Sequence, residues 1–220
     1  MSNGTFSNFV SFLILNLMAK PNWLQVDPST GSGNGTIANS ASAHTGRVAR
    51  TGTVTVTGVG VSTPATYQVT QEPKAEFASF DNGAEMSANK GAGKVTVTGK
   101  SNSSKLTFAW ATESGQGVEI PLTYMAGGSS TNNGEAIAGD PGASAQYAFS
   151  IELDFPTNDT VEEVTRTLMV TANGGQASQI AIVQAAGDAR LSVEPTEITI
   201  PQDGSSVSVQ VKSNTSWTVS

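Results

Sequence analysis

The chain has 220 residues, of which 37% are hydrophobic and only 13% are charged, and its formal net charge is −7. It contains no cysteine, which excludes disulfides, thiolate metal sites and a cysteine nucleophile, and one histidine, which excludes a histidine-rich metal cluster. The acidic balance argues against a nucleic-acid surface, which would need a basic stripe. The abundant Gly, Ser, Thr and Val instead favour short strands and turns.

The first element along the chain is an apolar stretch, FVSFLILNL, at residues 9–17. It is shorter than the roughly 20 residues of a membrane helix, and no Lys or Arg precedes Lys20, so neither a membrane span nor a signal peptide is predicted. Two interpretations of residues 1–18 stay open: an upstream extension of the reading frame, or an apolar arm that must be buried against another element or subunit. The residues of such an arm that would contact a capsid or another subunit are Phe9, Val10, Phe12, Leu13, Ile14 and Leu15.

Apolar and polar residues alternate along most of the remaining chain, which predicts half-buried β-strands. The predicted strands lie within residues 51–58, 94–99, 149–155, 179–184 and 205–213. Stretches rich in turn residues separate them, and the longest is MAGGSSTNNGEAIAGDPGAS at 125–144. With no amphipathic helix predicted, this pattern indicates an all-β fold of two immunoglobulin-like antiparallel β-sandwiches.

Several phrases recur along the chain. Three pairs lie 112, 113 and 116 residues apart: KSNSS (100–104) and KSNTS (212–216), Gln71 and Gln184, and Arg50 and Arg166. These offsets imply a module of about 113 residues. Residues 75–187 hold both the early and the late phrases, residues 19–74 only the late ones, and residues 188–220 only the early one.

The split phrases predict how the modules are assembled. Residues 75–187 form one sandwich, and residues 19–74 pack with 188–220 to form the other, because a two-stranded ribbon alone is marginal in water. Left unpaired, the C-terminal part would expose five apolar residues: Ile198, Ile200, Val207, Val209 and Val211. Exposing all five forfeits on the order of 10 kcal/mol. Closure within one chain gives a permuted module and is favoured by effective concentration, whereas closure between chains is strand donation.

The two terminal pieces resemble a known family. LSVEPTEITIPQDGSSVSVQVKSNTSWTVS (191–220) resembles the opening of a BACON module, and PNWLQVDPSTGSGNGTI (21–37) resembles its continuation. ARTGTVTVTG (49–58) and YQVTQ (67–71) are similar to its closing strands, whereas residues 75–187 lack the Trp-Leu-x-Val phrase. The resemblance implies immunoglobulin-like sandwiches. The architecture also resembles auxiliary capsid and head-fibre (decoration) proteins of crAss-like bacteriophages of Bacteroidales.

These resemblances imply a non-enzymatic structural virion protein, assembled in the host cytoplasm. Its expected partners are the major capsid protein or other virion proteins, and further copies of itself. The alternative is a glycan- or mucin-binding module of a Bacteroidetes cell-surface protein, in which Trp23, Trp110 and Trp217 stack on sugars. Trp23 and Trp217 fall in strand phrases, where packing in the core is the competing interpretation.

The sequence offers no catalytic residues, cofactor site or metal site. There is no G-x-S-x-G elbow, and His44 lies in the polar stretch ASAHTGR, where a solvated side chain is expected. The DNG sequence at 81–83 lacks the further carboxylates of a calcium loop.

Overall fold

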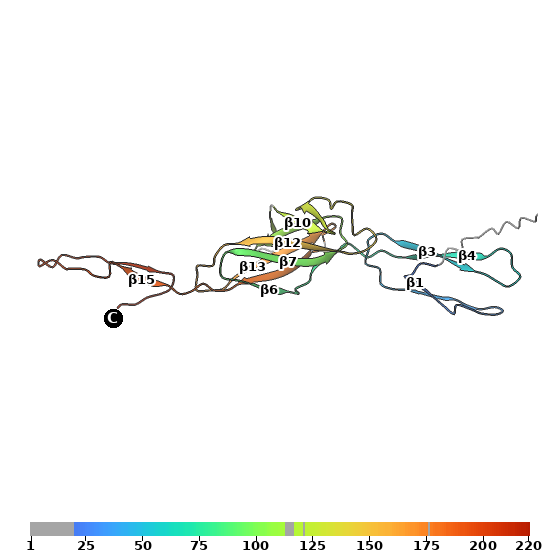
Figure 1. The fold of residues 1–220 in the computed structure, drawn as a ribbon, viewed down its shortest axis with the longest axis horizontal. Coiled ribbons are helices and arrows are strands. Elements are labelled where there is room, and N and C mark those ends of the chain that lie inside the picture. The colour runs from blue at the N-terminus through green and yellow to red at the C-terminus, as the bar shows by residue number, and fades with distance from the viewer. Residues whose placement is uncertain (1–19, 113–116, 121, 176) are drawn as a thin grey trace, which may run out of the picture. The chain divides into compact units, whose positions relative to one another are not determined.

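The structure, a computed structural model, describes residues 20–112, 117–120, 122–175 and 177–220, and these residues form an all-β fold (Figure 1). The chain divides into two compact units. Unit 1 holds the described residues up to His44 together with Ala49–Glu72, and unit 2 holds Thr45–Val48 and Pro73–Ser220. The fold class expected from the alternating strands is therefore confirmed. The residues of the apolar stretch at 9–17 lie outside the described part of the chain.

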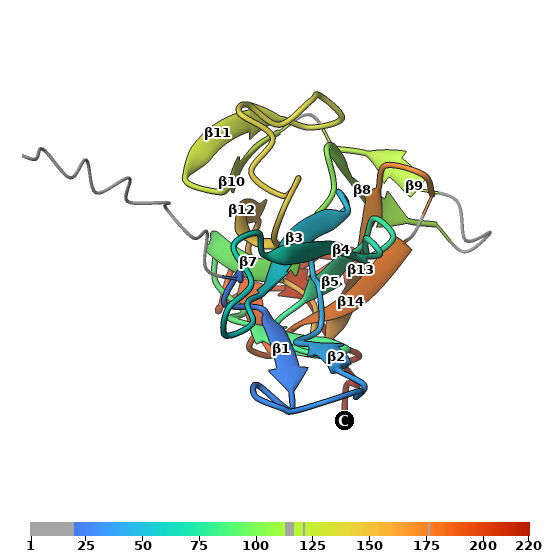
Figure 2. The same cartoon turned by 90° about the vertical axis from the view of Figure 1, so that its right-hand side faces the viewer.

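Unit 2 contains the middle sandwich, which consists of two five-stranded sheets (Figure 2). The first sheet runs in the order β11 (Ser129–Asn132), β10 (Thr123–Ala126), β12 (Tyr147–Phe155), β7 (Gly93–Ser101), β5 (Ala78–Phe80). The second runs in the order β6 (Glu85–Ala88), β14 (Ala177–Gln184), β13 (Val164–Ala172), β8 (Leu106–Ala111), β9 (Gly117–Glu119). Its edge strand β6 pairs in parallel with β14.

The core of the middle sandwich follows from the alternation along these strands. Every second residue of β12 is buried, and the same face of β13 and β14 supplies residues with no exposed surface. Phe108 lies at the centre, with its ring edge-to-face to Tyr124 at 5.0 Å and to Phe149 at 5.6 Å between centroids. Offset and edge-on contacts of this kind are the favoured geometry of aromatic pairs.

The turn-rich stretch at 125–144 contributes more regular structure than its composition suggested. Strands β10 and β11 form a hairpin whose two loop residues, Gly127 and Gly128, both have positive φ (56° and 84°). Two successive residues with positive φ make the tight turn that suits strand twist, and glycine adopts this conformation without steric cost. The Gly-Gly pair is thus the centre of a hairpin.

Unit 1 consists of two hairpins. One is formed by β1 (Leu24–Asp27) and β2 (Ala38–Ala41), and the other by β3 (Arg50–Val56) and β4 (Ala65–Gln71). Leu24 and Val54 are its buried hydrophobic residues, 1% and 6% exposed. A Cβ atom at Gly52 would lie 2.5 Å from Pro21 Cγ, so the glycine allows the segment before β1 to approach β3 closely.

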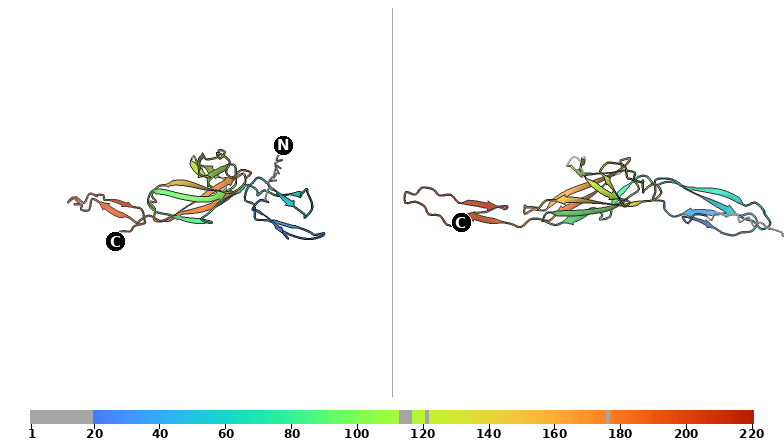
Figure 3. Two further views of the ribbon diagram at one scale, coloured as in Figure 1. Left: turned by 45° about the vertical axis from the view of Figure 1, so that its right-hand side comes forward. Right: turned by 45° about the horizontal axis from the view of Figure 1, so that its top comes forward.

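The C-terminal part of unit 2 is a third hairpin, formed by β15 (Leu191–Glu194) and β16 (Gln210–Ser213) (Figure 3). Only the last four residues of the strand predicted at 205–213 are in a ladder. Most apolar side chains of this C-terminal part are exposed, among them Leu191, Val193, Ile198, Ile200, Val207 and Val209. The joining of residues 19–74 with residues 188–220 into one sandwich stays a prediction.

Candidate interaction sites: two matched asparagine clusters

The KSNSS phrase runs from the end of β7 into the following turn and places Asn102 in a buried network. The side chain of Asn102 is fully buried, and its Oδ1 accepts a hydrogen bond from the Phe77 N–H (2.9 Å). Its Nδ2 donates to the backbone carbonyls of Thr45 (3.0 Å), Lys74 (3.3 Å) and Ala75 (3.3 Å). We call Asn102 and these four partners the first asparagine cluster. One side chain thus satisfies backbone groups of two separate segments, at residue 45 and at residues 74–77, as buried polar groups require.

Charged side chains reinforce the first cluster. Arg47, only 13% exposed, donates to the Asn102 carbonyl (2.6 Å) and forms ion pairs with Asp140 and, at 3.7 Å, with Glu76. Burial raises the pKa of Glu76, but hydrogen bonds from Ser103 and Ser104 and the positive charge of Arg47 outweigh it, so the pKa is lowered overall. Glu76 is therefore held as a carboxylate.

The tyrosine beside this cluster is held in its neutral form. The Tyr147 hydroxyl donates to the Ser103 carbonyl at 2.9 Å, and burial raises the pKa of Tyr147 to about 12. The hydroxyl therefore remains a proton donor at any physiological pH, and it fixes the turn between β7 and β8.

The KSNTS phrase places Asn214 in an equivalent network. Asn214 Oδ1 accepts from the Arg190 N–H (2.7 Å), and Nδ2 donates to the carbonyls of Asp159 (2.9 Å) and Asp188 (2.8 Å). We call Asn214 and these three partners the second asparagine cluster. Unlike the first, it is exposed, and its ion pair between Arg190 and Asp159 (3.0 Å) joins side chains that are 62% and 67% exposed.

The strands that lead into the two clusters also match. The two ladders pair equivalent residues, which lie 112 or 113 positions apart in the sequence. In β5·β7 the pairs are Ala78↔Ser101, Ser79↔Lys100 and Phe80↔Gly99. In β15·β16 they are Leu191↔Ser213, Ser192↔Lys212 and Val193↔Val211. The turn after each ladder is closed by a backbone N–H that donates to a serine Oγ: Ser103 to Ser101 (2.9 Å) and Thr215 to Ser213 (3.0 Å). We call residues 77–104 the first front segment and residues 190–216 the second front segment.

Unit 1 matches the other half of the middle sandwich. Arg50 Nε donates to Gln71 Oε1 at 2.8 Å, and Arg166 Nη1 donates to Gln184 Oε1 at 3.2 Å. Each glutamine also donates from Nε2 to a backbone carbonyl: Gln71 to Ser42 (2.9 Å) and Gln184 to Pro156 (2.7 Å). The repeated phrases thus mark repeated structure, and β3·β4 is the counterpart of β13·β14.

The three tryptophans lie in different surroundings. Trp23 packs beside Gly52 under the guanidinium of Arg50, which lies 4.6 Å from its ring centroid, whereas Trp217 is 50% exposed. Trp110 stands edge-on to Phe155 at 6.1 Å. The structure does not bring the three together into one aromatic platform.

Trp110 also lines an open depression on the middle sandwich. The rest of the lining is mostly polar: Ala111, Thr112, Thr165, Arg166, Thr167 and Gln179. Arg166 stacks over the Phe155 ring at 4.9 Å. An aromatic edge surrounded by hydroxyl, amide and guanidinium groups can provide both apolar contact and hydrogen bonds to a polar ligand.

Among the residues with an assigned structure, no group of three or more His, Asp or Glu is placed to hold a metal ion. No helix in the same part of the chain is long and apolar enough to cross a membrane. The expectation that His44 is solvated is wrong: it is 9% exposed and counts among the buried polar residues. Its polar neighbours along the sequence gave no indication of this burial, which comes from the tertiary fold.

The sequence of unit 1 is similar to a known family. The family model described as "Viral BACON domain" matches residues 7–72. This range covers all four strands of unit 1 and the phrases PNWLQV, ARTGTVTVTG and YQVTQ. None of the curated proteins matches the chain. The resemblance of the N-terminal part to a BACON-type module is therefore confirmed, and the module that it resembles is the viral one.

Proposed function

We propose that this protein is a non-enzymatic structural protein of a bacteriophage virion, an auxiliary capsid or head-decoration protein. The observation that carries the proposal is the match of residues 7–72 to the viral BACON domain. In this role the protein would be assembled in the host cytoplasm and would bind the major capsid protein or another virion protein. Phages of the crAss-like group are the expected source.

The construction of the chain supports a structural role. Immunoglobulin-like segments recur, and each of the two front segments ends in an asparagine that bonds to backbone groups of neighbouring segments. Repeated β-sandwich modules are a scaffold that can host many functions, and binding another protein surface needs no catalytic cleft. The apolar residues between Phe9 and Leu15 lie outside the described part of the chain, and their contact with the capsid stays part of the proposal.

The proposal is tested on purified phage particles. Antibodies raised against the middle sandwich are used for immunogold electron microscopy, and the particles are analysed by mass spectrometry. We expect the peptides to co-purify with the particles and the gold to label heads, while antibodies to a tail protein label tails. Presence of the protein in infected cells but not in purified particles would contradict the proposal.

The depression beside Trp110 supports a second candidate function, binding of host-surface glycans. Its aromatic edge and the polar side chains around it are the groups that a sugar ring would need. Titration with host capsular polysaccharide or mucin glycans, followed by calorimetry, tests this candidate. If it holds, Trp110→Ala abolishes binding and Trp217→Ala, which removes an exposed tryptophan elsewhere, leaves it unchanged.

A further inference from the structure

The dipeptide Asn-Gly occurs five times in the chain, at residues 3–4, 34–35, 82–83, 133–134 and 173–174. The first pair lies outside the described residues, and the other four lie in loops or turns. Asparagine followed by glycine is prone to ring closure, in which the glycine nitrogen attacks the asparagine side chain, because glycine has no Cβ to hinder the approach. The rate at each pair then depends on how firmly the fold holds the asparagine.

The side chain of Asn133 is held by three hydrogen bonds. Its Oδ1 accepts from the Phe108 N–H (2.7 Å), and its Nδ2 donates to the carbonyls of Phe108 and Ile120 (both 2.8 Å). The nitrogen that would attack it is engaged as well, because the Gly134 N–H donates to the Leu106 carbonyl at 3.0 Å. Ring closure at this pair requires these hydrogen bonds to break first.

Asn173 is held less firmly. Its Nδ2 donates to Ser104 Oγ (3.1 Å) and to Glu76 Oε1 (3.5 Å), and its backbone N–H donates to Ser103 Oγ (2.8 Å). The residue is exposed, so water competes for the two side-chain hydrogen bonds. We therefore expect a reactivity between that of a fixed and that of a free asparagine.

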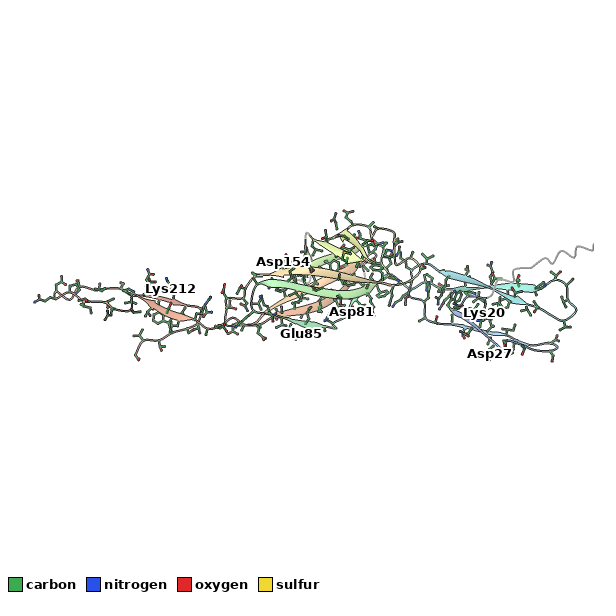
Figure 4. The ribbon with its side chains drawn as sticks, in the orientation of Figure 1. Lys20, Asp27, Asp81, Glu85, Asp154 and Lys212 are labelled. Atoms are coloured by element: carbon green, nitrogen blue, oxygen red, sulfur yellow. The ribbon has the colours of Figure 1, made fainter. Side chains whose placement is uncertain are left out.

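Asn34 lies in the open loop that joins β1 to β2. Figure 4 labels Asp27, the last residue of β1, where this loop begins. Asn34 is exposed, and its side chain makes no hydrogen bond in the part of the chain that the structure describes. A Cβ atom at Gly35 would meet no atom within 4 Å. Nothing described in the fold thus keeps the Asn34 side chain away from the Gly35 nitrogen.

Asn82 is also exposed, but it lies in a short turn. Figure 4 labels Asp81 and Glu85, on either side of it, and residues 81–84 join β5 to β6. The Asp81 N–H donates to the Thr98 carbonyl at 3.0 Å, and Gly83 has a positive φ of 74°. The side chain is free of hydrogen bonds within the described residues, whereas the backbone is constrained.

We propose that Asn34-Gly35 is a site of spontaneous covalent modification, at which the folded protein deamidates without an enzyme. The Gly35 nitrogen forms a bond to Asn34 Cγ and loses its proton to water. The side-chain amide nitrogen takes up a proton and leaves as ammonia, which closes a succinimide ring. Water then opens the ring at either carbonyl and leaves aspartate, or isoaspartate with one more methylene in the main chain. Each event adds one negative charge to the net charge of −7.

The expected order of reactivity is Asn34, Asn82, Asn173, Asn133. Breaking the three side-chain hydrogen bonds of Asn133 slows ring closure there by about a hundredfold relative to Asn34. The loop around Gly35 has room for the extra methylene, so the modified protein stays folded. This inference does not depend on the virion role.

Peptide mapping by mass spectrometry tests the order within one chain. The protein is incubated at mildly alkaline pH, which promotes loss of the glycine proton, in 18O-labelled water, which marks every ring opened during the incubation. Conversion at Asn34 should exceed conversion at Asn133 by about a hundredfold. A parallel sample in urea, where only local sequence remains, should convert both at similar rates. Equal conversion in the folded protein, or conversion at Asn34 in urea alone, would overturn the proposal.

Gly35→Ala is the matched variant for the mechanism. Gly35 has no positive φ and its surroundings are open, so alanine fits the loop as it stands. The added methyl group hinders the attack and should lower conversion at Asn34 by about tenfold, while conversion at Asn82 stays unchanged. Conversion at Asn34 that is as fast in Gly35→Ala as in the natural protein would show a route without ring closure and would overturn the proposed step.

Discussion

The two front segments share one local structure but differ in what covers them. Their ladders have the same register, and their asparagines make the same kinds of hydrogen bonds. Yet Val97 is fully buried and its counterpart Val209 is 37% exposed, while Ala88 is 9% exposed and its counterpart Ile200 is 62% exposed. The difference shows that pairing and turn are set by local sequence, whereas burial depends on a second half-sandwich that packs against the segment.

The largest difference in stability is expected between variants that place an aspartate at Val97 or at its counterpart Val209. Val97→Asp puts a carboxylate into the fully buried core and should cost the middle sandwich about 4 kcal/mol or more. Val209→Asp should leave the thermal midpoint of the middle sandwich unchanged, because its side chain contacts solvent. Differential scanning calorimetry at low protein concentration measures both variants. Equal destabilisation would show that the second front segment is already part of the same core.

The next largest difference in stability is expected between alanine variants of Asn102 and Asn214. Asn102→Ala removes a fully buried side chain and leaves backbone groups of four residues without their partner, so we expect a loss of about 3 kcal/mol. Asn214→Ala should cost about 1 kcal/mol or less, because water reaches the same groups in the exposed cluster. Urea denaturation followed by circular dichroism compares the two losses. If Asn102→Ala were as mild as Asn214→Ala, the first cluster would have no stabilising role.

The first cluster should also give the protein an acid-sensitive component of stability. The folded-state pKa of Glu76 lies below its ordinary value of 4.5, so the stabilisation is fully present above pH 4.5 and is lost as the pH falls through the folded-state pKa. Glu76→Gln lacks this ionisation. The gap in thermal midpoint between the natural protein and Glu76→Gln should therefore shrink between pH 5 and pH 3. A gap that stayed constant over this range would contradict the assigned role of the carboxylate.

The smallest effect is expected at the surface of the second cluster. Arg190→Ala breaks an ion pair whose side chains are both more than half exposed, and such pairs contribute about 0–1 kcal/mol. Arg47→Ala is the matched variant in the first cluster, where the guanidinium is 13% exposed and bonds to Asn102 and Asp140. Urea denaturation at low and high salt should show a clear loss for Arg47→Ala and almost none for Arg190→Ala.

Much of the fold could be predicted because its signals are local. Alternation located β3, β7, β12 and β14, and the spacing of the repeated KSN phrase indicated that residues 100–104 and 212–216 occupy equivalent places in a repeated module. It gave no indication of the hydrogen bonds that the two asparagines make. The hairpin of β10 and β11 was missed because its strands are short and polar, and its pairing depends on the neighbouring β12.

The site was less predictable, because its partners are remote in sequence. Arg47 reaches Asn102 across 55 positions, and no pattern around either residue announces the contact. The burial of His44 was likewise hidden by its polar neighbours. The match between the Arg50–Gln71 and Arg166–Gln184 hydrogen bonds was signalled by the repeat, but only the structure shows that the side chains meet.

The central claim is that one local structure recurs in the two front segments and is buried only in the first. Native-state hydrogen exchange at low protein concentration, followed by mass spectrometry, tests it most directly. The account predicts strong protection of the amides of β7 and weak protection of the amides of β16. Equal protection of the two strands would contradict it.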